Sequence, residues 1–154
     1  SKNEGITDTT EVLLFQAARA QIYRQVVIPA LNAGKVVIMD RTRDSSVVYQ
    51  GMVRGFGKEL IEELNDISTK KIVPDLTLLL DVSVKTGLDR RIDSGKMDRL
   101  DMEAKSFHKK VRDAYLDLAN EKKQKRWRII DAEKSVEEVA DMIWQAVSEK
   151  IKAE

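Results

Sequence analysis

The sequence predicts an α/β protein whose parallel sheet is covered by helices on both faces. Three short runs of apolar residues are spaced along the chain, at Val36–Met39, Leu76–Leu80 and Trp127–Ile130. Stretches with the apolar spacing of amphipathic helices separate these runs. Unbroken apolar strands that alternate with helices are typical of a parallel sheet buried on both faces. We expect residues 1–154 to form a single domain.

Each apolar run is followed directly by an aspartate, at Asp40, Asp81 and Asp131. In open parallel sheets, ligands bind beyond the carboxyl ends of the strands. The sequence therefore predicts a site at that edge of the sheet.

The first expected helix begins at Asp8, because Asp8 and Glu11 have the spacing of an N-cap and its N3 partner. Pro29 should bend this helix near its end, and Gly34 should terminate it. Its apolar stripe consists of Val12, Phe15, Ile22 and Val26. The later helices are expected over about 46–67 with an interruption at Gly55–Gly57, from an N-cap at Ser83, over about 104–120, and from a capping box of Ser135 and Glu138.

The composition narrows the class of partner. The chain has 27 basic and 26 acidic side chains and a formal net charge of +1, which gives no general reason to expect nucleic acid or membrane as a partner. No apolar run approaches the length that spans a bilayer. The absence of cysteine excludes disulfides and fits a reducing compartment, so we expect a cytoplasmic protein.

Charged and hydroxyl side chains gather after the first apolar run, at Asp40, Arg41, Arg43, Asp44, Ser45 and Ser46. An arginine offers a planar fork that matches phosphate, and a helix N-terminus adds free N–H groups. This pattern predicts an anion site. The alternative is a helix cap beside a surface ion pair between Asp40 and Arg41.

Two further groups have both a functional and a structural interpretation. Phe15 and Arg19 are one helical turn apart, so a ring and a guanidinium share a face that suits a base and its phosphate; the alternative is a core Phe and a surface-reaching Arg. A polar stretch between two helices carries Arg90, Arg91, Lys96 and Arg99. It suits a lid that closes cations over phosphates, or an ordinary solvated connection.

Taken together and in order, these motifs resemble the thymidylate kinase family of P-loop enzymes. The matching pieces are TEVLLFQAARAQ (10–21), PALNAGKVVIMDRTRDSSVVYQG (29–51), GKELIEELND (57–66), PDLTLLLDV (74–82), MDRLDMEAKSFHKKVRDAYLDLA (97–119) and RIIDAEKSVEEV (128–139). The resemblance implies a P-loop kinase fold and transfer of the ATP γ-phosphoryl group to dTMP, giving dTDP, with Mg²⁺ as cofactor. It also implies a homodimer with the 10–30 and 46–67 helices in the interface. Tyr23, Val27 and Ile28 are the expected contacts, because they lie off the apolar stripe.

The resemblance implies a role for each candidate site residue. Phe15 would stack on the thymine, and Arg19 would contact the base or the acceptor phosphate region. Arg41 would bind the dTMP phosphate, and Asp40 would lie near the metal and the reacting phosphates. Ser45, Ser46, Tyr49 and Gln50 would line the monophosphate site, with Tyr49 crowding the sugar 2′ position. The catalytic cations would come from a lid over about 90–101, at Arg90, Arg91, Lys96 and Arg99.

The chain departs from the family pattern at two positions. Thr42 follows the Asp-Arg pair where the family usually has Tyr or His, and Ser94 stands where bacterial members with a catalytic lid arginine carry it. The change at Thr42 leaves open a broader deoxynucleoside monophosphate kinase.

The family's phosphate-binding motif, G-x-x-x-x-G-K-[ST], does not occur in these residues. We therefore expect the chain to be the C-terminal two-thirds to three-quarters of a longer kinase, and not to fold stably without the missing first strand, which would leave strand edges unpaired. The alternative is a nucleotide-binding pseudokinase.

Overall fold

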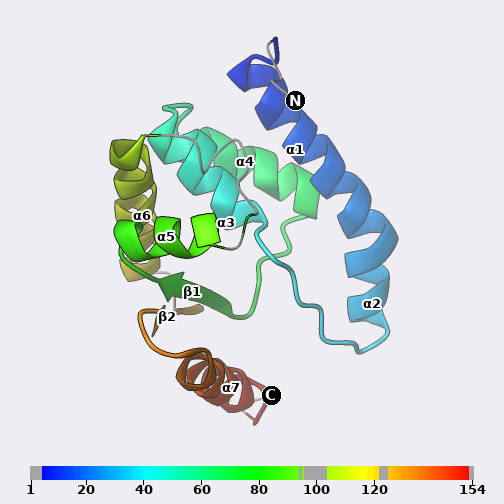
Figure 1. Ribbon diagram of the computed structural model, residues 1–154. Helices are drawn as coiled ribbons and strands as arrows, with labels where there is room; N and C mark the ends of the chain where they lie inside the picture. Colours follow the sequence, from blue (N-terminus) through cyan, green and yellow to red (C-terminus); the bar gives the residue numbers. More distant parts are fainter. Residues whose placement is uncertain (1–4, 94, 96–103, 122–124, 153–154) are drawn as a thin grey trace. The chain divides into compact units, whose positions relative to one another are not determined.

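The computed structural model describes residues 5–93, 95, 104–121 and 125–152. The chain divides into two compact units, residues 1–73 and residues 74–154 (Figure 1). The expectation of a single domain stays a prediction. Most of the expected lid lies outside the described residues.

The first unit is helical. A long helical segment consists of α1 (Asp8–Ile22), the π-helical turn η1 (Tyr23–Val27) and α2 (Ile28–Asn32). A second consists of α3 (Arg43–Ser46), the π-helix η2 (Val47–Val53) and α4 (Lys58–Thr69). The predicted interruption at Gly55–Gly57 is confirmed: it lies between η2 and α4, where Gly57 has a φ of 91°.

Capping residues close in sequence define both ends of the first helical segment, and the observed N-cap lies one residue before the predicted one. The N-cap is Thr7 and not Asp8, because the Thr7 Oγ1 atom accepts a hydrogen bond of 3.2 Å from the Thr10 backbone N–H. At the other end Gly34 has a φ of 71°, and its N–H donates to the Leu31 carbonyl. The predicted termination by glycine is confirmed.

The buried face of the first helical segment differs from the predicted stripe. Val12, Gln16, Tyr23 and Val27 are buried, whereas Phe15, Ile22 and Val26 are about half exposed. The predicted stripe is therefore correct only at Val12. Tyr23 and Val27 are 2% and 5% exposed, so the prediction that they form intersubunit contacts is wrong: they already pack inside this unit. The buried apolar residues of the unit are Val12, Tyr23, Val27, Val47, Val48 and Ile61.

The predicted strand at Val36–Met39 is absent from the structure. Residues 35–39 form no ladder, and the Val36 and Ile38 side chains are 75% and 92% exposed. An apolar sequence favours a strand, but a strand exists only when a neighbouring chain segment pairs with its backbone. In the described residues only β1 and β2 pair with each other.

The second unit contains that pair. Strands β1 (Thr77–Asp81) and β2 (Trp127–Asp131) run parallel, with Asp81 opposite Asp131 in the register. The predictions of strands at these two positions and of a parallel sheet are confirmed. Figure 1 shows α7 (Val136–Lys152) on the other side of the strand pair from α5 (Val84–Asp93) and α6 (Lys105–Asn120).

Helix caps in this unit follow the sequence. The Ser83 hydroxyl accepts from the Thr86 backbone N–H at the start of α5. At the start of α7, the Ser135 N–H donates to the Glu138 carboxylate and the Glu138 N–H donates to the Ser135 hydroxyl, so the predicted capping box is confirmed. The buried residues of the unit are Val111, Ala114, Leu118, Trp127, Ile130 and Ala132.

Candidate functional site

Arg41 and Tyr49 meet at the surface of the first unit. The Arg41 Nη2 atom donates a hydrogen bond of 2.6 Å to the Tyr49 hydroxyl, and the guanidinium carbon lies 5.0 Å from the centre of the ring. Arg41 has a φ of 55°, a left-handed conformation that is uncommon for a residue with a side chain. Lys70 and Lys71, with φ of 53° and 61°, share this conformation among the described non-glycine residues, and Arg41 is the one of the three that belongs to the predicted site.

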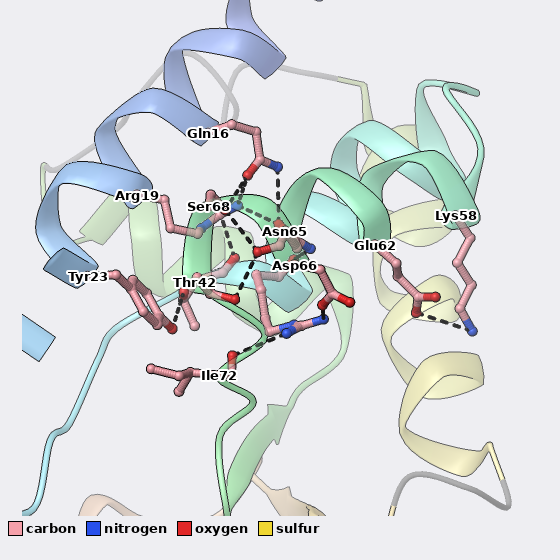
Figure 2. Close-up of polar contacts among 12 residues, drawn as sticks. Gln16, Arg19, Tyr23, Thr42, Lys58, Glu62, Asn65, Asp66, Ser68 and Ile72 are labelled. Carbon is pink, nitrogen blue, oxygen red and sulfur yellow. Dashed lines mark hydrogen bonds and ion pairs between the residues drawn. The ribbon is translucent and has the colours of Figure 1, made fainter. Parts of the chain in front are cut away.

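Arg19 of α1 holds the segment that leads from α2 into α3 (Figure 2). Its Nη2 atom donates to the Thr42 carbonyl at 3.2 Å and to the Ser46 Oγ at 2.8 Å. Its Nη1 atom donates to the Asn65 Oδ1 at 2.6 Å and to the Gln16 Oε1 at 3.0 Å. One guanidinium thus joins three helical elements.

Asn65 is the centre of this network. It is fully buried, at 0% exposure, and its side chain uses both polar atoms. The Oδ1 atom accepts from Arg19 and from the Gln16 Nε2, the latter at 3.1 Å, while the Nδ2 atom donates to the Arg43 carbonyl at 3.0 Å. The Ser68 hydroxyl completes the network by donating to the Gln16 Oε1 at 2.7 Å.

Burial changes the electrostatics of Arg19. Removal from water disfavours the charged form, and this desolvation is the largest cause of the lowered pKa of the Arg19 guanidinium. The four acceptors of Arg19 named above are neutral amide, carbonyl and hydroxyl oxygens, so they satisfy its hydrogen bonds without neutralising its charge.

A second set of contacts fixes η2 against α1. The Gln50 Nε2 donates to the Glu11 Oε1 at 3.3 Å. The Arg54 Nη1 donates to Glu11 and to Asp8, each at 2.8 Å. Tyr49 and Gln50 both lie on η2, a wide helical turn of the kind that recurs at functional sites.

The remaining predicted residues of the first unit lie around this region. Asp40 is exposed beside Arg41, and Ser45 is half-buried between Asp44 and Ser46. Phe15 is 49% exposed, so the alternative that it is a core residue is wrong. Arg19 and Ser46 are brought into contact, as are Arg41 and Tyr49.

Arg43 belongs to the structural part of the cluster. Its side chain is buried, with Nη1 donating to the Ile72 carbonyl at 3.2 Å and Nη2 to the Asp66 carboxylate at 3.1 Å. These contacts tie the start of α3 to the end of α4. Although Arg41 and Arg43 are only two positions apart, Arg41 lies at the surface and Arg43 is buried.

In the second unit, Arg90 holds the loop after β2. Its Nη1 atom donates to the Ala132 carbonyl at 2.7 Å, and its Nη2 atom to the Glu133 carbonyl at 3.4 Å. The Glu133 carboxylate in turn accepts from the Ser83 backbone N–H at 2.7 Å, and this bond is the first cause of its lowered pKa. Arg91 is half-buried on the same helix. Lys96 and Arg99 lie outside the described residues.

Asp81 and Asp131 lie side by side at the carboxyl ends of their strands, as the sequence predicts. The Arg112 guanidinium donates two hydrogen bonds, of 2.7 and 2.8 Å, to the two oxygens of the Asp81 carboxylate. Among the described residues, no group of three or more His, Cys, Asp or Glu side chains is placed to hold a metal ion. Asp40, the carboxylate that the sequence places near the metal, is exposed.

Sequence reasoning missed Gln16 and Asn65. A signal was present for Asn65: it follows Ile61 by four positions in α4, and both residues are fully buried. A polar residue on a buried helical stripe indicates an internal hydrogen-bond partner. Gln16 carried no comparable signal, because the predicted stripe of its helix was assigned to the wrong face.

Within the part of the chain that the structure describes, no helix is long and apolar enough to cross a membrane.

Comparison with known proteins places these features in a family. A family model described as thymidylate kinase matches residues 1–143. The thymidylate kinase of Pelobacter propionicus is 41% identical over 147 residues, covering 92% of this chain and 67% of the relative. That of Geotalea uraniireducens is 43% identical over 151 residues, covering 94% of this chain and 70% of the relative.

A solved structure agrees. The crystal structure of thymidylate kinase from Ehrlichia chaffeensis matches with a TM-score of 0.71 and 28% identity, over 96% of this chain and 68% of the other. The predicted P-loop kinase fold is therefore confirmed. The chain belongs to the thymidylate kinase family, whose reaction is the transfer of a phosphoryl group from ATP to dTMP.

Proposed function

We propose that Arg41 binds the phosphate of dTMP during this reaction. The observation that carries the proposal is the surface pair of Arg41 and Tyr49, in which a strained backbone and a 2.6 Å hydrogen bond hold the guanidinium in one place. A guanidinium matches the geometry of phosphate oxygens and needs no further positioning when it is held in advance. Tyr49 then lies against the adjoining sugar.

The base end of the acceptor nucleotide is assigned to Arg19, Ser46 and Phe15. Arg19 and Ser46 are hydrogen-bonded to each other, and Phe15 offers an exposed ring on the same helix as Arg19. The positive charge of Arg19 attracts electron-rich oxygens such as those of a pyrimidine ring. Ser45 and Gln50 complete the proposed acceptor site.

Asp40 is the proposed carboxylate for Mg²⁺. Magnesium sites that serve phosphates commonly use one or two carboxylates, with the phosphates and water supplying the other ligands, so an exposed single Asp beside Arg41 fits such a site. The bound ion would offset negative charge on the phosphates. Arg41 fixes the acceptor phosphate, whose oxygen forms the new P–O bond as the bond to ADP breaks, giving dTDP.

We keep Arg91, Lys96 and Arg99 as proposed lid cations. Arg90 has a different environment, because its two terminal nitrogens donate to the backbone carbonyls of the loop after β2. This supports a positioning role for Arg90 within the proposed catalytic group. A cytoplasmic location stays a prediction of the sequence.

The test is a coupled assay of the full-length protein with ATP and dTMP. Arg41→Ala should lower kcat/KM by at least about 100-fold, the range typical of a lost phosphate-binding donor. Arg24→Ala is the matched control, because Arg24 is an exposed arginine on η1 in the same unit. Activity like wild type in the Arg41 variant would refute the assignment.

We also propose that the protein forms a homodimer through α1. Leu13 and Leu14 are each 55% exposed and Ile22 is 48% exposed, and Val26 on the following η1 is 56% exposed, so this helical segment presents apolar side chains beyond those that it buries. Leu14→Glu should shift the mass in light scattering from dimer to monomer. Val136→Glu, which changes an 80% exposed residue on α7, should leave the dimer intact. A monomeric wild type would contradict the proposal.

A further inference from the structure

Asn65 reaches both halves of the proposed acceptor site, although it lies on a different helix. Its Oδ1 atom accepts from Arg19 at 2.6 Å. Its Nδ2 atom donates to the Arg43 carbonyl, two residues after Arg41, at 3.0 Å. The buried Asn65 amide therefore holds the Arg19 guanidinium, which is assigned to the base. It also holds the backbone just after Arg41, the residue assigned to the phosphate.

The amide is suited to this place for a chemical reason. On two separate atoms and without a charge, it supplies an acceptor toward a buried arginine and a donor toward a buried carbonyl. A carboxylate would still accept from Arg19, but it would repel the Arg43 carbonyl and neutralise the guanidinium. The 0% exposure of Asn65 means that water cannot replace either bond.

The conformation of the segment between Asp40 and α3 depends on hydrogen bonds from Arg19 and Asn65. Arg19 holds the Thr42 carbonyl at 3.2 Å while Asn65 holds the next carbonyl, that of Arg43. These two bonds anchor the residues immediately after Arg41, whose φ of 55° must be maintained by its surroundings. Loss of the anchor releases the strain and moves the Arg41 side chain away from Tyr49.

We propose that Asn65 is a positioning residue for the acceptor nucleotide: it sets the charge and placement of Arg19 and the backbone path next to Arg41 without touching dTMP itself. The inference rests on the proposed function, in which Arg19 and Arg41 bind the acceptor.

The decisive variant is Asn65→Asp, which is nearly isosteric, tested in the full-length protein. The KM for dTMP should rise about tenfold, which corresponds to the loss of one buried hydrogen bond, here the bond from Asn65 Nδ2 to the Arg43 carbonyl. The KM for ATP should stay within about twofold. This split separates positioning of the acceptor from a general loss of folded enzyme, which lowers the active fraction without changing either KM.

Ser68→Ala is the matched control. Ser68 is buried in the same network and donates to Gln16 and to the Asn65 backbone carbonyl, but the contacts of Arg19 and of residues 41–46 described above do not include it. We expect a lower Tm and an unchanged KM for dTMP. An equal rise in the KM of both variants would overturn the proposal, as would an unchanged KM for dTMP in Asn65→Asp.

Arg19→Ala distinguishes the two levels of inference. If it leaves the KM for dTMP unchanged, the assignment of Arg19 to the acceptor is wrong, and the role of Asn65 falls with it. If it raises the KM while Asn65→Asp does not, only the role of Asn65 is wrong. A rise in both variants supports the proposal.

Discussion

The Arg112 guanidinium and the Asp81 carboxylate form a two-bond ion pair that closes the end of β1 against α6. The Nε and Nη2 atoms of Arg112 lie 2.7 and 2.8 Å from the two carboxylate oxygens. The hydrogen bond to Asp81 is the first cause of the raised pKa of Arg112. Both carboxylate oxygens of Asp81 are thus used in a structural ion pair, although Asp81 lies at the edge of the sheet where the sequence predicts a site.

Removal of this ion pair should cost measurable stability. Because the Arg112 side chain is 40% exposed, solvent screens the pair, and we expect Arg112→Leu to lower the free energy of unfolding by only about 1 kcal/mol. Lys109→Leu, which breaks the more exposed pair with Asp113 on the same helix, should cost no more than about 0.5 kcal/mol. Urea denaturation measures both, and equal losses would contradict the ranking.

The N-cap of α1 gives a test of the observed helix start. Thr7→Ala removes the hydroxyl that accepts from the Thr10 N–H, and should lower the free energy of unfolding by about 0.5–2 kcal/mol. Thr9→Ala, an exposed change inside the first turn, is the control and should have a smaller effect. If Asp8 were the true cap, Thr7→Ala would be nearly neutral in the same denaturation experiment.

The contact between Arg41 and Tyr49 predicts energetic coupling. Tyr49→Phe keeps the ring but removes the hydroxyl that accepts from Arg41, so the KM for dTMP should rise about fivefold. In an Arg41→Ala background the same change should have no further effect, because its partner is gone. Additive effects in this double-mutant cycle would show that the Tyr49 hydroxyl acts independently of Arg41.

Glu133 should contribute a pH-dependent part of the stability. Its hydrogen bond from the Ser83 N–H, followed by bonds with the Ser83 and Thr86 side chains, lowers its pKa from the ordinary value of 4.5. A carboxyl group with a lower pKa in the folded state stabilises the protein above its unfolded pKa, and this stabilisation is lost as the pH falls through the folded pKa.

The measurement is the Tm as a function of pH from 7 down to about 3. Glu133→Gln should be less stable than wild type at pH 7, and the difference should shrink as the solution is acidified. Glu137→Gln, which removes an exposed carboxylate at the start of α7, should not reproduce this convergence. A constant difference between Glu133→Gln and wild type across the whole range would rule out the linkage.

The proposed site was partly accessible from sequence. The strand-end pattern indicates Arg41 and the family resemblance implies Tyr49, and the structure brings these two residues into contact. The sequence does not predict Asn65 as part of the site, because its hydrogen-bond partners Gln16 and Arg19 are 49 and 46 residues away in the chain. The spacing of Asn65 from Ile61 indicates that an internal partner exists, but it does not say which distant residue that partner is.

The sequence by itself determined the start of α7, the glycine that ends the first helical segment and the apolar strands β1 and β2. These features depend on hydrogen bonds within a few residues, or on apolar runs that favour a strand. The tertiary structure decided that α1 turns Gln16 and Tyr23 inward and leaves Phe15 and Ile22 exposed, and that Val36–Met39 remains unpaired. A buried polar network and a strand ladder both require distant partners, so a local pattern specifies neither.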